Sequence, residues 1–123
     1  MKVNFSVKGS SVPDFGILLS NRRNEMGLSL EHLQRRLWEQ KKIRVSRTFL
    51  NFLENGKKKP PYDLAVVLAE VLSINTKEIL RAAYHARTKY DRDREKGYLQ
   101  KALENNNLGD IKLEEIVTQL ETN

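Results

Sequence analysis

The sequence predicts an all-α protein in which five short helices form a compact core and a helical segment follows at the C-terminus. Three observations support this fold class. Apolar residues recur at helical spacing along the 123-residue chain, capping residues stand before these stretches, and glycine or proline follows several of them. We expect residues 1–12 to form an N-terminal arm, residues 13–83 the core domain, and residues 84–123 a helical extension.

The first helix is predicted to begin near Pro13. The run Ser11-Val12-Pro13-Asp14 has the form of a capping box, and proline is tolerated in a first helical turn because its missing N–H group is not needed there. Gly27 can adopt the left-handed conformation that commonly ends a helix. The residues expected to face the core are Phe15, Leu18, Leu19 and Met26.

The second helix is predicted to begin after Ser29, its cap, and to extend to about Lys41, because no stop signal occurs before Val45. A short loop should follow, and either Ile43 or Val45 should anchor this loop in the core. The residues of the second helix expected to face the core are Leu33 and Leu37.

Three further helices are predicted between Ser46 and Ala83. Ser46 can cap the third helix, Gly56 can end it, and Asn75 can cap the fifth. Residues 57–61, three lysines and two prolines, form a basic loop that separates the third helix from the fourth. The residues expected to point inward are Phe49, Leu50, Leu53, Leu64, Val67, Leu68, Val71, Leu72, Ile79, Leu80 and Ala83.

The C-terminal extension has two parts. Residues 87–96 alternate in charge and contain almost no apolar residue, which is typical of a solvated helix or a coil. Beyond an Asn-rich break, Asp110 can cap a last short helix, which is too short to be stable alone and must pack against another surface. The apolar stripe of this helix comprises Leu113, Ile116, Val117 and Leu120.

The charge of the chain is unevenly distributed. The net charge is +6, but residues 1–60 contain 13 Lys and Arg against 5 Asp and Glu, whereas residues 61–123 contain 9 against 11. A positive field of this kind attracts polyanions such as nucleic acid or an acidic membrane. The alternative is a solvated basic face that has no ligand.

Several classes of protein are disfavoured. No apolar run approaches the roughly 20 residues that cross a bilayer, and the absence of cysteine excludes disulfides and thiol catalysis and fits a reducing cytoplasm. His32 and His85 lack metal-spaced partners, and no nucleophile stands beside a base. We expect a cytoplasmic protein that is not an enzyme and needs neither a metal nor another cofactor.

Four landmarks occur in order along the first two thirds of the chain. They are Arg23, the run Gly27-Leu28-Ser29, the run Val45-Ser46-Arg47-Thr48-Phe49-Leu50, and the run Leu53-Glu54-Asn55-Gly56 before the lysines and Pro60. With the apolar pattern of the last two core helices, they make the stretch from about Phe15 to Leu80 similar to the Cro/phage-repressor helix-turn-helix family, also called the Xre family. The resemblance implies a five-helix, repressor-like DNA-binding domain, and an ion pair between Arg23 and Glu54.

The sequence departs from the family pattern at several positions. Leu30 replaces a glutamine that contacts a DNA phosphate in the family, and Ser73 replaces a glycine after the fourth helix. Phe52 occupies a position that is often polar and faces DNA. Residues 38–44 replace the single glycine of the usual turn before the third helix, an insertion of about six residues.

The third helix carries the residues expected to read bases. A helix in the major groove reads base edges with the exposed side chains of its first turns. Arg47 suits guanine, Asn51 suits adenine, and Thr48 suits a phosphate or a thymine methyl group. An ordinary solvated helix face is the alternative. The residues expected to bind phosphates are Lys41, Lys42, Arg44, Asn55, Lys57, Lys58 and Lys59.

We therefore expect a sequence-specific regulator of transcription, of bacterial or phage type, that binds double-stranded DNA. A protein-interaction module of the same fold, such as an antitoxin or a repressor antagonist, is the alternative. Because one recognition helix covers only a half-site, a regulator needs a self-association surface. Residues 84–123 are favoured as that surface in a homodimer, ahead of folding back on the core or docking on another protein.

Overall fold

The computed structural model describes residues 12–117, and within this range the chain forms eight helices and no strand. The predicted all-α class is therefore confirmed. The five core helices are α1 (Phe15–Glu25), α2 (Leu30–Lys41), α3 (Arg47–Glu54), α4 (Tyr62–Leu72) and α5 (Thr76–His85). The C-terminal extension contributes α6 (Lys89–Arg94), α7 (Lys96–Asn105) and α8 (Leu113–Val117).

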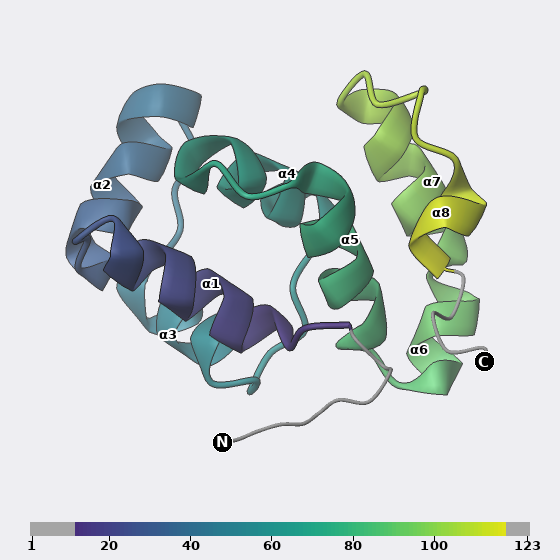
Figure 1. Ribbon diagram of the computed structural model, residues 1–123, viewed down its shortest axis with the longest axis horizontal. Helices are drawn as coiled ribbons and strands as arrows, with labels where there is room; N and C mark the ends of the chain where they lie inside the picture. The colour runs from purple at the N-terminus through teal and green to yellow at the C-terminus, as the bar shows by residue number, and fades with distance from the viewer. Residues whose placement is uncertain (1–11, 118–123) are drawn as a thin grey trace.

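Figure 1 shows α1, α2 and α3 on one side of α4 and α5, and the helices of the extension on the other side. Contacts between elements agree with this arrangement. Helix α2 packs on α3 and α4, and α1 packs on α3 and α5. In the extension, α7 packs on α4 and α8 packs on α5. The central pair α4–α5 thus separates the amino-terminal helices from the extension.

Side-chain caps fix the starts of the core helices largely as predicted. Ser29 accepts a hydrogen bond from the backbone N–H of His32 at 3.0 Å, Ser46 caps α3, and Asn75 caps α5. The first cap was wrongly predicted. Asp14, not a residue of a box starting at Ser11, accepts from the N–H of Ile17 at 3.1 Å, since its carboxylate suits the positive end of the helix dipole. Ser11 and most of the expected arm lie outside the described residues.

One apolar core joins all these layers. Leu33, Leu37, Leu50 and Leu53 are fully or almost fully buried, as their spacing predicts. Phe49 and Val67 are only half-buried at its edge. The extension adds its own side chains to the same core, so residues on both sides of position 83 are packed into one unit. These added side chains are Leu99, Ala102, Leu103 and Ile116.

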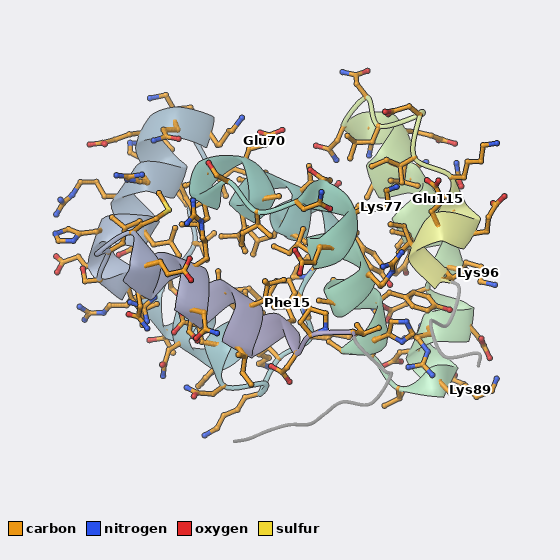
Figure 2. All side chains as sticks on the ribbon, viewed as in Figure 1. Phe15, Glu70, Lys77, Lys89, Lys96 and Glu115 are labelled. Atoms are coloured by element: carbon orange, nitrogen blue, oxygen red, sulfur yellow. The ribbon has the colours of Figure 1, made fainter. Side chains whose placement is uncertain are left out.

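The last helix folds back on the core. Ile116 is completely buried, and Leu113 and Val117 are half-buried against the core, whereas Leu120 lies outside the described residues. Polar contacts hold α8 to α5: the guanidinium of Arg81 donates to the carbonyl of Glu115 at 2.6 Å. Figure 2 shows the side chain of Glu115 next to Lys77 of α5, and their charged atoms are 3.8 Å apart.

The prediction for residues 87–96 was wrong in part. This stretch forms α6 and the start of α7, and two of its charged side chains, Arg87 and Glu95, are buried. Alternating charge indicates a solvated segment only when the charges remain in water. Here a buried cation and a buried carboxylate satisfy each other, as buried charges must.

Candidate nucleic-acid interface

The helices α2 and α3 form a rigid pair that presents one face of α3 to solvent. The inner faces of both helices carry leucines that are fully or almost fully buried where the helices pack together. Ser46 fixes the start of α3 through a 3.0 Å hydrogen bond to the N–H of Phe49. At its end, Gly56 has a φ of 73°, and the N–H of Lys57 donates to the carbonyl of Phe52 at 2.8 Å. The orientation of α3 is thus set at both ends.

The predicted base-reading residues share the exposed face of α3. Arg47, Thr48 and Asn51 are all exposed, and their spacing places them within little more than one helical turn. The amide nitrogen of Asn55 donates to the side-chain oxygen of Asn51 at 3.1 Å and to its carbonyl at 3.0 Å. Asn55 thereby orients the amide of Asn51, whose oxygen keeps a second lone pair for another donor.

The connection between α2 and α3 follows the predicted course. The helix ends at Lys41, and Lys42 takes the left-handed conformation, with a φ of 56°, that glycine adopts most easily. The N–H of Ile43 then reaches back to the carbonyl of Leu37 at 3.2 Å, which closes the helix end. Val45 packs against the core and accepts a 3.0 Å hydrogen bond from the Gln34 amide, so Val45 is the stronger anchor of the loop.

Two cations of this connection gather on an exposed tryptophan. The guanidinium of Arg44 lies 4.4 Å from the ring centre of Trp38, and the ammonium of Lys42 lies 5.3 Å from it. Contacts of this kind hold a cation in place while leaving it accessible to an anion. Lys41 differs, because its ammonium pairs with Glu70 of α4.

The three lysines after α3 also differ in whether a carboxylate pairs with them. Lys57 and Lys58 are exposed and lie directly beyond the end of α3. The ammonium of Lys59, by contrast, contacts the carboxylates of Asp91 and Glu95 in the extension. Lys59 therefore differs from Lys57 and Lys58 in its ion pairs, although its side chain is still 39% exposed.

Arg23 and Glu54 form a two-pronged ion pair below the exposed face of α3. Two guanidinium nitrogens of Arg23 donate to the carboxylate oxygens of Glu54 at 2.6 and 2.9 Å, and a third donates to the carbonyl of Leu28 at 2.7 Å. The hydrogen bond with Glu54 raises the pKa of Arg23 despite its partial burial. The pair joins α1, the turn before α2 and the end of α3, which is a structural role.

Sequence reasoning missed the ion-pair network of Lys59, Arg87 and Glu95. Lys59 is far from the other two members in the sequence, and no local pattern marks a lysine that pairs with a carboxylate 36 residues away. Among residues 12–117, no group of three His, Cys, Asp or Glu could hold a metal ion, and no helix is long and apolar enough to cross a membrane.

Comparison with known proteins gives one match. The family model described as Helix-turn-helix matches residues 19–79, which span α2, α3 and α4 completely, together with most of α1 and the first part of α5. No curated protein and no solved structure matches the chain.

Proposed function

Since residues 19–79 place the chain in the Xre/Cro-type helix-turn-helix family of DNA-binding regulators, we propose that it binds specific sequences of double-stranded DNA and regulates transcription in a bacterium or phage. The main support for this proposal is the position of the exposed face of α3. The exposed face of α3 lies between two groups of accessible cations, one on the connection before it and one on the loop after it.

The proposed reading mechanism assigns separate tasks to these groups. With α3 in the major groove, Arg47 can donate two hydrogen bonds to guanine, and Asn51 can pair with adenine. Lys42 and Arg44 contact phosphates at one end of α3, and Lys57 and Lys58 do so at the other. The phosphate contacts supply affinity on any sequence, and the base contacts supply the preference.

We further propose that the regulator acts in the cytoplasm as a homodimer, which adds a second half-site about one helical turn away. The apolar side of α8 is already covered by the core, so the contact must use the outer faces of residues 84–123. Tyr90 and Tyr98 lie on these faces and are 71% and 63% exposed. Sedimentation at tens of micromolar should give a dimer, and a palindromic duplex should bind more tightly than a half-site.

Selection of bound duplexes from a random pool tests the proposed function. The chain alone should enrich one motif, and its affinity for that motif should fall steeply with salt. A pool that stays random, together with a protein that is recovered in complex with another protein, would instead support an interaction module such as an antitoxin or a repressor antagonist.

A further inference from the structure

Arg87 and Glu95 are the only buried charged residues in the described part of the chain, and neither lies on the proposed DNA-reading face. The Nε of Arg87 lies 2.9 Å from a carboxylate oxygen of Glu95, and one of its terminal nitrogens donates to the carbonyl of Ala83 at 2.9 Å. Its guanidinium also lies 4.0 Å from the ring centre of Tyr62, at the start of α4. The pair therefore sits where α4, α5 and the extension meet.

Lys59 connects this buried pair to the basic loop of residues 57–61. Its ammonium contacts the second carboxylate oxygen of Glu95 and lies 3.1 Å from a carboxylate oxygen of Asp91. The hydrogen bond with Glu95 raises the pKa of Lys59, and the hydrogen bond from Lys59 lowers the pKa of Asp91. The next residue, Pro60, is buried. The carboxyl-terminal part of the loop is thus held by ion pairs and by a buried proline; Lys57, Lys58 and Lys59 are all exposed, but only Lys59 is held by carboxylates.

Breaking the contact between Lys59 and Glu95 would cost free energy because of where Glu95 lies. Glu95 is 4% exposed, so withdrawing Lys59 would leave a buried carboxylate with fewer donors. A DNA phosphate competing for Lys59 would have to overcome that cost, whereas it meets no such competitor at Lys57. Fixing a loop in its bound conformation also reduces the entropy lost on binding.

We propose that Lys59 is a positioning residue rather than a phosphate ligand: held by Asp91 and Glu95, it fixes the basic loop so that Lys57 and Lys58 meet the DNA backbone. The extension then contributes to DNA binding without touching DNA. This inference rests on the proposed function, and its test has one part that needs no DNA.

The DNA part of the test compares single substitutions by the salt dependence of affinity. Lys57→Met should flatten the slope of log affinity against log salt by about 0.9, the value for one lost phosphate contact. Lys59→Met should leave the slope unchanged and weaken binding to all duplexes by roughly threefold to tenfold, as expected when an ordered segment becomes free. Lys77→Met is the matched control for net charge, because Lys77 lies on α5, outside both the proposed phosphate contacts and residues 84–123, and its ammonium is 3.8 Å from a carboxylate oxygen of Glu115. It should change neither quantity.

The DNA-free part measures hydrogen exchange at the amide of Lys57, which donates to the carbonyl of Phe52 at 2.8 Å. Exchange should be faster in Lys59→Met and close to wild type in Lys59→Arg, which keeps the cation. If Lys59→Met does not fold, Asp91→Asn replaces it, since that change leaves the buried pair of Arg87 and Glu95 intact and should also speed exchange.

Two results would overturn the inference. A slope that flattens by about 0.9 in Lys59→Met, as in Lys57→Met, would make Lys59 a phosphate ligand. If the amide of Lys57 exchanged at the wild-type rate in Lys59→Met and Asp91→Asn without DNA, the ion pairs would not fix the loop. A protein that binds no DNA but shows the expected exchange would contradict the proposed function alone.

Discussion

At the scale of single residues, the charged side chains near α3 fall into two groups that the sequence alone does not separate. Arg47, Lys57 and Lys58 are exposed, whereas Arg23 and Lys59 are held by carboxylates. A cation that is already paired gains less from a phosphate, so a count of basic residues would overstate the number of cations available to one. The pairs themselves stabilise the fold that presents the others.

The Arg23–Glu54 pair gives the first prediction. Glu54→Ala should lower the free energy of unfolding by ~3 kcal/mol, because it leaves a partly buried guanidinium without its carboxylate. The side chains of Arg23 and Glu54 are 14% and 8% exposed. Glu25→Ala is the control, since Glu25 pairs with Arg22 at the surface and should cost less than about 1 kcal/mol. Equal denaturation midpoints for the two variants would show that the inner pair contributes no more than an exposed one.

At the scale of elements, the contact between α1 and α3 depends on a residue that has no side chain. A β-carbon built on Gly16 would lie 2.2 Å from the carbonyl oxygen of Glu54 and 2.9 Å from that of Leu53. The start of α1 therefore lies directly against the backbone of α3. This contact keeps the end of α3 in place next to the basic loop.

We predict that Gly16→Ala is strongly destabilising, by roughly 1–3 kcal/mol or more, because the obstructing atoms are backbone and the helices must separate. Gly97→Ala is the matched control: Gly97 lies in α7, and an added β-carbon there meets no atom within 4 Å. That change should be neutral or stabilise the helix by up to about 1 kcal/mol. Thermal unfolding of both variants measures the difference, and similar midpoints would mean that α1 does not pack closely on α3.

The attachment of α6 should depend on pH. Burial alone would raise the pKa of Glu95, but the hydrogen bonds from Lys59 and Arg87 outweigh burial and lower it, and the hydrogen bond from Lys59 lowers the pKa of Asp91. A lowered carboxyl pKa stabilises the fold fully above the unfolded-state pKa, near 4, and this contribution is lost as the pH falls further. Thermal midpoints should therefore fall below about pH 4.5, and less steeply in Glu95→Gln than in wild type. Parallel curves would mean that this carboxylate does not contribute.

At the scale of the whole molecule, the extension belongs to the core that the helix-turn-helix helices form. Ile116 of α8 and Leu103 of α7 are almost completely buried in the same cluster as Leu80 of α5. Any self-association through the described part of the extension, residues 84–117, must therefore leave these side chains in place and use the opposite, exposed faces.

Ile116→Ala should consequently lower the free energy of unfolding of the whole domain by about 2–4 kcal/mol, as cavity-forming substitutions do. Ile17→Ala is the control, because Ile17 is 57% exposed on α1 and should change stability by less than about 0.5 kcal/mol. Chemical denaturation at several protein concentrations measures both. Two results would contradict burial of Ile116 in the core of its own chain. The free energy of unfolding could be the same in Ile116→Ala as in wild type, or it could depend on protein concentration in wild type but not in the variant, which would place Ile116 in an interface between copies.

Local patterns made most of the fold predictable. The caps at Ser29, Ser46 and Asn75 and the extent of α2 could be read from the sequence because they depend on neighbouring residues. The exposed residues of α3 were predictable from helical spacing. The buried pair of Arg87 and Glu95 and the ion pairs of Lys59 were not predictable from local patterns, because they form only when the extension packs on the core. The apolar stripe of α8 allowed three arrangements, of which pairing with a second copy was favoured; in the structure the described part of the stripe instead packs on the core of the same chain, the arrangement ranked next.

The proposed reading of bases by α3 can be tested by a cycle of substitutions in protein and DNA. Affinities of wild type and Asn51→Ala are measured on the selected duplex and on duplexes changed at one base pair, with Lys58→Met as the control. Asn51→Ala should cost ~1–3 kcal/mol on the selected duplex and lose the preference at one base pair, whereas Lys58→Met should weaken binding equally on every duplex. If Asn51→Ala also weakened binding equally on all duplexes, Asn51 would not read a base, which would contradict the proposed role of the exposed face of α3.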